Sequence, residues 1–348
     1  MAVLDSCFAC GAHESGGASG AGGSRHPAHD SDGGSGARDR ARADRPRVLV
    51  IVGPTGVGKT EVSCLVAREI GGEIVSADSR QMYRGLDVGT DKPDKAVLKK
   101  APHHLLDILD PSERFDAARF SAMARDCFVD IGARGKVPML VGGSGLYVKA
   151  ALFGIFPSPS KDENLRARLD TQEDENPGSL HERLRRVDPD RAAQLRPADR
   201  HRIVRALEFF ELTGVRMSEA LEKWVADGWP HLAVGLTRPR RELYRRIDLR
   251  VTQMFERGLL KEVRSLLDRG VPADSPGLDS IGYEEALTHL AGELSRDEMI
   301  ALIQRNSRRY AKRQLTWFRR MPLSGWISLD DAPRAASKVV ALWRHARA

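Results

Sequence analysis

The sequence predicts an α/β protein built on a parallel β-sheet, with a helical segment inserted into the core. Short apolar runs alternate with stretches of helical periodicity from Arg47 onward, which is the pattern of βαβ units. Between residues 157 and 230 the strand pattern stops, and the chain becomes charged, helical and interrupted by turns such as "DPD" and "RPAD". These two observations together predict a doubly wound sheet with a helical insertion.

The predicted elements follow one another with short connections. The first strand, Val48–Val52, leads into a glycine-rich loop, and a later strand at residues 137–143 leads into Ser144. A strand at Leu232–Thr237 returns to the sheet after the insertion, and long helical patterns then occupy residues 240–320. The remaining strands are predicted at residues 73–77, 104–109 and 326–329, and the remaining helices at residues 60–70, at residues 116–133 and after Ser144.

The composition changes along the chain and predicts five segments. The first 46 residues are mostly Gly, Ala, Ser, Asp and Arg, so they lack the apolar side chains needed to form a core, and we expect them to be disordered. They also lack the apolar stretch of a secretory signal. In chain order the segments are a disordered tail (1–46), the first part of the core (47–156), the helical insertion (157–230), the second part of the core (231–330) and a C-terminal helix or tail (331–348).

The bulk properties narrow the class of protein. Of the 348 residues, 41% are hydrophobic, and no apolar run approaches the roughly 20 residues that a membrane helix needs. The net charge of +7 makes a polyanionic partner plausible. Cys64 and Cys127 fall on apolar helical stretches, so we predict buried thiols in a reducing, cytoplasmic setting rather than a disulfide scaffold.

The sequence "GPTGVGKT" matches the phosphate-binding P-loop in full. Its glycines let successive backbone N–H groups point inward, Lys59 adds a positive charge, and the hydroxyl of Thr60 can bind Mg²⁺. A strand precedes the loop and a helix follows it, which is the context that supports the motif. The predicted phosphate-binding residues are Gly53, Pro54, Thr55, Gly56, Val57, Gly58, Lys59 and Thr60.

A second metal-binding carboxylate is missing where P-loop nucleotide hydrolases usually carry one. The candidate strand ends in "MLVGGSG", without Asp or Glu at its tip. The strand over residues 73–77 is the one followed by a carboxylate, that of Asp78, next to Ser79. Because ligands of open α/β sheets bind at the carboxyl ends of the strands, Asp78 is a candidate functional residue, although such a residue can also serve only as a turn or helix cap.

Two basic regions lie in the second part of the core. Arg246 and Arg250 are four residues apart on one predicted helical face and could reach a phosphate, or could equally form a solvated surface. Further on, "QRNSRRYAKRQLTWFRR" places basic side chains on one arc of a helix and apolar ones on the other, which predicts a track for a nucleic-acid backbone. The basic arc is Arg305, Arg308, Arg309, Lys312 and Arg319, and the opposite side is Tyr310, Ala311, Leu315, Trp317 and Phe318.

Several strings together resemble the bacterial tRNA dimethylallyltransferases, also described as the IPP transferase family. They are "GPTGVGKT", "SADSRQMYRGLDVGTDKP", "APHHLLDILDP", "VGGSGLY" and "SIGYEEA", in this order, and the resemblance covers roughly residues 47–330. It implies a P-loop kinase-like core with a helical insertion that binds the tRNA anticodon stem-loop. The implied reaction moves a dimethylallyl group from dimethylallyl diphosphate to N6 of adenosine 37 in tRNAs that read codons beginning with U.

The resemblance also implies roles for particular residues. Asp78 would accept a proton from the adenine amine or orient it, and the P-loop with Arg250 would stabilise the departing pyrophosphate. The implied catalytic residues are Asp78, Lys59, Thr60, Arg250 and Ser144, with Mg²⁺ on Thr60. The implied tRNA-binding residues are Asp78, Ser79, Arg80, Gln81, Ser144, Arg166, His201, Arg202, Ile203, Val204 and Arg205. We expect a monomeric cytoplasmic enzyme.

Three alternative functions would explain only some of these sequence features. A nucleotide or small-molecule kinase would explain the P-loop and the arginines, but it would need ATP and a second metal-binding carboxylate. A prenyltransferase acting on free adenine nucleotides would need neither the insertion nor the basic track. A non-catalytic RNA-binding module would explain the basic helix and leave the P-loop without a role.

Overall fold

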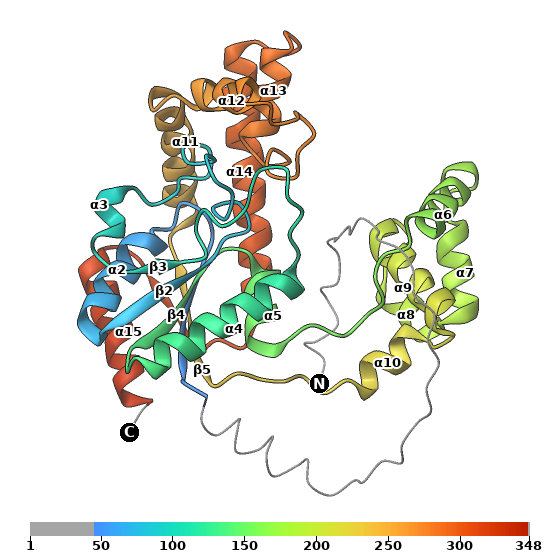
Figure 1. The fold of residues 1–348 in the computed structure, drawn as a ribbon, viewed down its shortest axis with the longest axis horizontal. Coiled ribbons are helices and arrows are strands. Elements are labelled where there is room, and N and C mark those ends of the chain that lie inside the picture. The colour runs from blue at the N-terminus through green and yellow to red at the C-terminus, as the bar shows by residue number, and fades with distance from the viewer. Residues whose placement is uncertain (1–44, 347–348) are drawn as a thin grey trace, which may run out of the picture. The chain divides into compact units, whose positions relative to one another are not determined.

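A computed structural model of the chain describes residues 45–346 (Figure 1). The prediction of a disordered tail over residues 1–46 therefore falls outside the described residues, except for Arg45 and Pro46. Both of these contact Trp229: its Nε1 donates to the Pro46 carbonyl at 2.8 Å, and the Arg45 guanidinium lies 4.7 Å from the centre of its ring.

The described residues form two units. The helical unit comprises Phe153–Asp227 together with Arg114–Ala118, and the core unit comprises the rest. The sequence placed the insertion at residues 157–230, close to the larger segment of the helical unit. Each unit has a hydrophobic core of its own.

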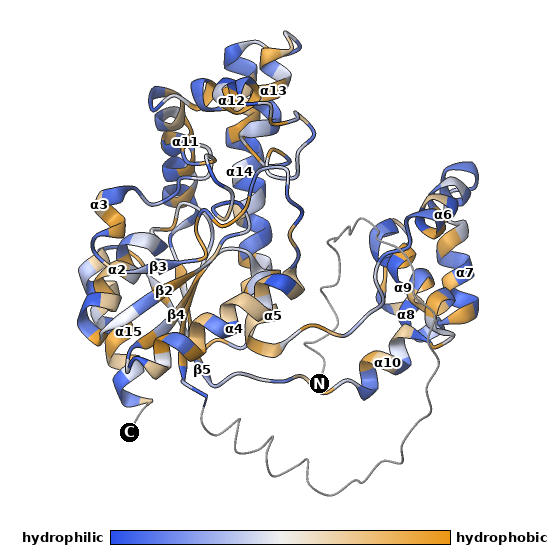
Figure 2. Ribbon diagram, in the orientation of Figure 1, coloured by the Kyte–Doolittle hydropathy of each residue, from blue (hydrophilic) through white to orange (hydrophobic). Residues whose placement is uncertain are grey.

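A six-stranded sheet of parallel strands forms the centre of the core unit. Its strands lie in the order β3-β2-β4-β1-β5-β6, so the chain crosses over between neighbours as in a doubly wound fold. Strands β1, β2 and β4 are almost wholly buried, and Figure 2 shows the central strands coloured toward the hydrophobic end of the scale. The strands are β1 Val48–Val52, β2 Gly72–Ala77, β3 His103–His104, β4 Val137–Gly142, β5 His231–Thr237 and β6 Gly325–Ser328.

The third strand is shorter than the sequence predicted. Residues 104–109 were expected to form a strand, but β3 contains only His103 and His104. The φ angles of Leu105 and Asp107 are +61° and +53°, in the left-handed region that a strand cannot contain. The chain therefore leaves the sheet, and Leu109 rejoins it only through an isolated bridge to Tyr83.

Helices cover the sheet and extend beyond its carboxyl edge. Figure 1 shows α2 and α15 on one face of the sheet and α4 and α5 on the other, whereas α11 and α14 run outward toward α12 and α13. The helices of the core unit are α2 Lys59–Ile70, α3 Lys95–Leu98, α4 Ala117–Ala133, α5 Gly145–Phe153, α11 Arg240–Glu256, α12 Leu259–Asp268, α13 Tyr283–Leu290, α14 Arg296–Phe318 and α15 Ala332–His345. The C-terminal segment is thus a helix, and its Val339 and Trp343 are part of the hydrophobic core.

The helical unit packs short helices around Leu184, Leu207 and Phe209. Within it, Phe156 and Phe209 have ring centres 5.5 Å apart. Its helices are α6 Glu163–Glu175, α7 Ser179–Val187, α8 Pro189–Gln194, α9 Arg200–Thr213 and α10 Met217–Lys223. The apolar spacing of these segments explains why the strand pattern was absent from this part of the sequence.

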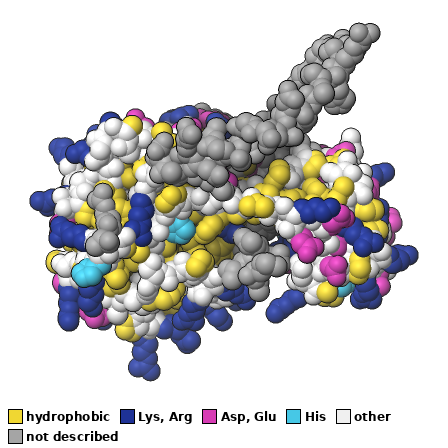
Figure 3. Space-filling model, turned by 90° about the horizontal axis from the view of Figure 1, so that it is seen from below, with side chains coloured by type: hydrophobic (Ala, Val, Ile, Leu, Met, Phe, Trp, Pro, Cys, Tyr) yellow, Lys and Arg dark blue, Asp and Glu magenta, His cyan; other side chains and the backbone are white. Residues whose placement is uncertain are grey.

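Three bulk predictions can be compared with the structure. Cys64 is buried, as predicted, whereas Cys127 on α4 is only half-buried. Across residues 45–346 we find no helix that is both long and apolar enough to cross a membrane. On the face shown in Figure 3, the core unit displays more Lys and Arg than Asp and Glu side chains, in keeping with the net charge of +7.

Candidate active site at the carboxyl ends of the strands

The carboxyl ends of β1, β2 and β4 meet at one cavity of the core unit. β1 leads into the P-loop, β2 into Asp78, and β4 into Ser144, and helices α11 and α14 close the other side. The cavity has a volume of about 770 Å³, within the range of ligand-binding sites. The close approach of β2 and β4 depends on Gly142, because a Cβ there would lie 2.1 Å from the Ala77 carbonyl oxygen.

The P-loop adopts the conformation that its glycines predict. Gly56 and Gly58 have φ angles of +76° and +105°, which other residues rarely adopt, and α2 begins directly afterwards at Lys59. The Nζ atom of Lys59 donates to the carbonyls of Gly53 and Pro54, both at 3.0 Å. The loop and the start of the helix line the cavity, and a helix start with a lysine beside it is the kind of site that binds phosphate.

Lys59 lies in a balance of opposing charges. Burial lowers the pKa of its amine from 10.5 to about 8; the negative charge of Asp78 opposes this, and the positive charge of Arg250 adds to it. Burial disfavours the charged form of the amine, so a multiply charged anion that binds beside it stabilises that form strongly. The site is therefore suited to a phosphate or diphosphate.

Two side chains that are distant in the sequence, one on α14 and one just after β5, hold the P-loop in place. Gln314 on α14 accepts from the amide of Thr55 at 2.8 Å, and its Nε2 donates to the Gly143 carbonyl at 2.9 Å. Arg238 donates to the Val57 carbonyl at 2.9 Å. Sequence reasoning missed both residues. The available signal for Gln314 was a polar residue within the face of α14 that was expected to be apolar.

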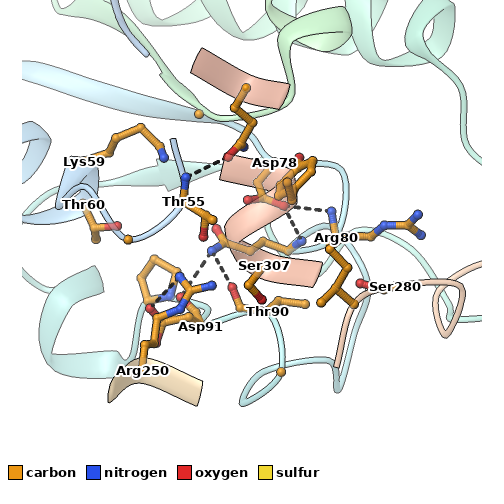
Figure 4. Close-up of a pocket in the computed structure, with 18 of the residues that line it drawn as sticks. Thr55, Lys59, Thr60, Asp78, Arg80, Thr90, Asp91, Arg250, Ser280 and Ser307 are labelled. Carbon is orange, nitrogen blue, oxygen red and sulfur yellow. Dashed lines mark hydrogen bonds and ion pairs between the residues drawn. The ribbon is translucent and has the colours of Figure 1, made fainter. Parts of the chain in front are cut away.

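Asp78 serves as a turn residue and also lines the cavity. Its Oδ1 accepts from the amides of Arg80 at 2.9 Å and Gln81 at 3.4 Å, as a turn residue does. The same carboxylate lines the cavity (Figure 4). The turn bonds fix the orientation of the side chain, so the capping role supports a functional role rather than replacing it.

Ser144 and Tyr310 lie beside Asp78. The Ser144 hydroxyl accepts from the Ser79 amide at 3.0 Å and donates to the Ser79 hydroxyl at 3.3 Å. The pKa of Tyr310 is raised by burial and by the charge of Asp78, while a hydrogen bond with Ser144 acts in the opposite direction. Tyr310, which the sequence placed on the apolar side of its helix, lines the cavity.

The two arginines of α11 both reach the cavity. Arg246 donates through Nε to the Gly56 carbonyl of the P-loop at 3.1 Å. Arg250 donates through one terminal nitrogen to Asp91 at 3.3 Å, and its buried Nε has no hydrogen-bond partner among the described residues. An unpaired donor in a cavity that already holds Lys59 favours an anionic ligand.

The other residues of the predicted base-contacting segment contact the protein itself. Arg80 donates to the Pro276 carbonyl at 2.8 Å, and the side-chain Nε2 of Gln81 donates to the carbonyls of Thr90 and Asp91, both at 3.2 Å. Both side chains line the cavity as well. Their contact with RNA stays a prediction.

The remaining predicted tRNA residues lie in the helical unit. Arg166 forms two hydrogen bonds, of 2.7 and 2.8 Å, to the fully buried Glu208, and Arg205 pairs with the same carboxylate. Ile203 and Val204 are buried in the core of this unit, so RNA contact by their side chains is at odds with their position. Of the other two predicted residues, His201 is exposed and Arg202 is half-buried.

The basic arc of α14 is narrower than predicted. Arg308 is half-buried and pairs with Asp248 of α11, so it belongs to the packing between these helices. The other members of the arc are exposed; they are Arg305, Arg309, Lys312 and Arg319. This exposed set remains the candidate track for a nucleic-acid backbone.

The residues around the P-loop fit a metal ion carried by the ligand better than one held by the protein alone. Within residues 45–346 there is no cluster of three or more His, Cys, Asp or Glu side chains that could bind a metal. Thr60 lies at the cavity with its hydroxyl-bearing side chain exposed. Mg²⁺ commonly uses few protein ligands and completes its shell with phosphate oxygens and water, so Thr60 together with a diphosphate fits it.

The fold and the cavity define a P-loop α/β protein in which the phosphate cradle faces a carboxylate across one pocket. A family model described as IPP transferase matches residues 81–321, and a model described as isopentenyl transferase matches residues 46–109. The chain belongs to the IPP transferase family.

Named relatives cover most of the chain. A tRNA dimethylallyltransferase of Geobacter sulfurreducens is 46% identical over 81% of this chain and 92% of its own length. One of Geobacillus thermodenitrificans is 42% identical over 86% of this chain and 96% of its own length.

Solved structures agree with this assignment. A tRNA isopentenylpyrophosphate transferase of Bacillus halodurans is 38% identical, with a TM-score of 0.64, and the match covers 86% of this chain and 96% of that one. A eukaryotic dimethylallyltransferase described as acting on tRNA is 29% identical, with a TM-score of 0.69, over 78% of this chain and 70% of that one.

Proposed function

We propose that the protein transfers a dimethylallyl group from dimethylallyl diphosphate to N6 of adenosine 37, in tRNAs that read codons beginning with U, and releases pyrophosphate. The observation that carries this proposal is that the P-loop, Arg250 and Asp78 open into the same cavity. Relatives at 42–46% identity are named for this reaction. They do not favour the alternative of a nucleotide or small-molecule kinase.

The cations of the cavity would stabilise the leaving group. As the bond between the allylic carbon and the diphosphate oxygen breaks, negative charge grows on the departing oxygens. Lys59, the amides of the P-loop and Arg250 are the groups in place to stabilise that charge. Mg²⁺ bound by Thr60 and the diphosphate would supply further positive charge to the same oxygens.

Asp78 would act as the general base that accepts a proton from the nucleophile. The exocyclic amine of adenine is a weak nucleophile, since its lone pair is delocalised into the ring, and it loses a proton as the carbon–nitrogen bond forms. Asp78 accepts that proton and later gives it to water. Ser144 and Tyr310, which lie beside Asp78, would orient the amine.

The target adenosine must leave its stack to enter the cavity, which costs least in a loop. Ser79, Arg80 and Gln81 are the candidate contacts to this base from the core unit. Arg166 and residues 201–205 are the candidate region of the helical unit for the anticodon stem-loop. We further propose that the enzyme acts as a cytoplasmic monomer.

The decisive experiment incubates the protein with unmodified tRNA, dimethylallyl diphosphate and Mg²⁺, followed by mass analysis of the nucleosides. The expected product is prenylated adenosine at position 37, and its absence contradicts the proposal. Replacing dimethylallyl diphosphate by ATP tests the kinase alternative in parallel.

A variant of Asp78 tests its assigned role. Asp78→Ala is expected to reduce kcat by about a hundredfold or more, since general-base catalysis typically contributes that much. Its affinity for tRNA should change far less. Equal losses in turnover and in tRNA affinity would show that Asp78 only binds RNA.

A further inference from the structure

Asp91 links two arginines at the edge of the cavity. Its Oδ2 accepts from Arg250 at 3.3 Å, and its Oδ1 accepts from Arg257 at 2.9 Å. Only one terminal nitrogen of Arg250 is engaged in this way, while its buried Nε has no hydrogen-bond partner among the described residues. Figure 4 shows Arg250 and Asp91 joined within the pocket. The contact thus engages one terminal nitrogen, while the Arg250 side chain remains 25% exposed and lines the cavity where a ligand would bind.

The turn that carries Asp91 is held rigidly. The carboxylate of Glu262 accepts from the three successive amides of residues 87–89 at 3.0, 2.7 and 3.2 Å, and from the hydroxyl of Tyr283 at 2.6 Å. Gln81 donates to the carbonyl of Asp91 at 3.2 Å. Asp91 itself has a φ of +53°, a conformation that Asp and Asn tolerate better than most residues. A carboxylate on such a turn is in place before any ligand arrives.

The positive charges of the cavity explain how this carboxylate can affect the position of Arg250. Lys59, Arg246 and Arg250 all line the site, and like charges repel one another until an anion binds. A flexible arginine would then turn outward to solvent. Asp91 opposes this by offering Arg250 a fixed partner at the rim, and Arg257 balances the charge of Asp91 from the other side.

We propose that Asp91 is a positioning residue for the diphosphate site: it holds Arg250 inward so that the free donors of the guanidinium meet the ligand. This inference rests on the proposed function only in the identity of the ligand as a diphosphate. In this role Asp91 acts through Arg250 and need not contact the diphosphate itself. The opposite reading is that Asp91 competes with the ligand for Arg250, and the two readings predict opposite effects when the carboxylate is removed.

The test measures pyrophosphate binding to the full chain by calorimetry in the presence of Mg²⁺. Asp91→Gly removes the side chain and suits the left-handed turn. It is expected to weaken binding about tenfold, the usual loss when one charge-assisted hydrogen bond is no longer organised. Asp91→Asn keeps an oxygen that can accept from Arg250 and should stay within about threefold of the wild type. Tighter or unchanged binding by Asp91→Gly would overturn the proposal, as would an equal loss in both variants.

A double-mutant cycle separates positioning from general structural damage. If Asp91 acts through Arg250, then Asp91→Gly has no further effect on binding in an Arg250→Ala background. Additive losses would mean that Asp91 acts elsewhere, and would overturn the proposal. Asp87→Asn is the matched control, because Asp87 lies in the same turn but pairs with Lys92. Thermal unfolding checks that each variant folds, and Asp91→Ser replaces Asp91→Gly if the glycine variant does not.

This experiment is independent of prenyl transfer. Pyrophosphate binding with a non-additive cycle supports the role of Asp91 even if no tRNA is modified, in which case only the proposed function fails. Conversely, prenylated tRNA together with an additive cycle supports the function and overturns the role of Asp91. A wild-type protein that does not bind pyrophosphate overturns the inference.

Discussion

At the scale of single residues, Lys59 is the cation whose charge is most finely balanced. Because the pKa of its amine is lowered to about 8, the free protein carries the ammonium below pH 8 and loses it above. A diphosphate binds the charged form, so binding above pH 8 requires the uptake of a proton. We predict that affinity for dimethylallyl diphosphate is flat between pH 6.5 and 7.5 and then falls, by up to about tenfold per pH unit above pH 8.

The pH dependence can be assigned to Lys59 by substitution. In Lys59→Met the titrating group is gone, so affinity should be low at every pH and the fall above pH 8 should disappear. Calorimetric titrations of both proteins across this range give the comparison. A slope that persists in Lys59→Met would place the titration on another group, in the ligand or the protein.

Residues differ in how far the sequence could predict them. The P-loop and Asp78 were predictable because a phosphate cradle is continuous in the chain, and Asp78 directly follows a strand. Gln314 and Asp91 were not predictable, because their roles exist only through partners brought together by folding. Thr55 and Gln314, for example, lie 259 positions apart in the chain. Spacing within the sequence carries no information about such a contact.

At the scale of elements, α14 links the P-loop to the end of β4. Gln314 is buried and bonds one backbone group on each side, Thr55 and Gly143. Gln314→Leu leaves both groups unsatisfied, so we predict a loss of about 2–4 kcal/mol in the free energy of unfolding and weaker binding of dimethylallyl diphosphate. Denaturant unfolding and calorimetry measure the two effects.

Two further variants sharpen this prediction. Gln314→Glu keeps the acceptor for Thr55 and loses the donor for Gly143, so its stability should fall between those of the wild type and Gln314→Leu. Thr316→Ala, on the exposed side of the same helix, should change stability little. A loss in Thr316→Ala as large as that in Gln314→Leu would indicate a general weakening of the helix.

A separate prediction concerns tRNA binding by the exposed face of α14. Arg305 and Arg309 are exposed, whereas Arg308 pairs with Asp248. If the exposed pair neutralises RNA phosphates, Arg305→Gln/Arg309→Gln should reduce the slope of log Kd for tRNA against log salt by about 1.5. Arg308→Gln should leave the slope unchanged. Filter binding across a salt series would contradict the assignment if the two proteins gave equal slopes.

Periodicity located most elements correctly but failed at β3. An apolar run such as residues 104–109 is consistent with a buried strand, and nothing in its composition marks the left-handed residues within it. Those angles follow from contacts that the run makes after folding, including the hydrogen bond of 2.8 Å from Ile108 to the Met82 carbonyl. Tertiary structure overrode local preference there.

At the scale of the whole molecule, the long interruption of the core unit, Phe153–Asp227, begins and ends at neighbouring points of the core. The amide of Trp229 donates to the carbonyl of Leu152 at 2.7 Å, so the two ends of the interrupted core chain are already adjacent. The intervening residues have a hydrophobic core of their own, around Leu184 and Leu207. This arrangement explains how a sheet interrupted in sequence still forms one core.

The junction gives a prediction for a deletion. Replacing residues 153–227 by a short Gly-Ser linker should leave the core unit folded, because the linker has only a small gap to span. The shortened protein should bind dimethylallyl diphosphate within about threefold of the full chain, since every residue lining the cavity is retained. It should lose tRNA affinity by about tenfold or more, as the basic side chains of the helical unit are removed. Calorimetry and filter binding measure the two affinities. An unchanged affinity for tRNA would assign RNA binding to the core unit alone, and a lost affinity for dimethylallyl diphosphate would show that the cavity depends on the helical unit.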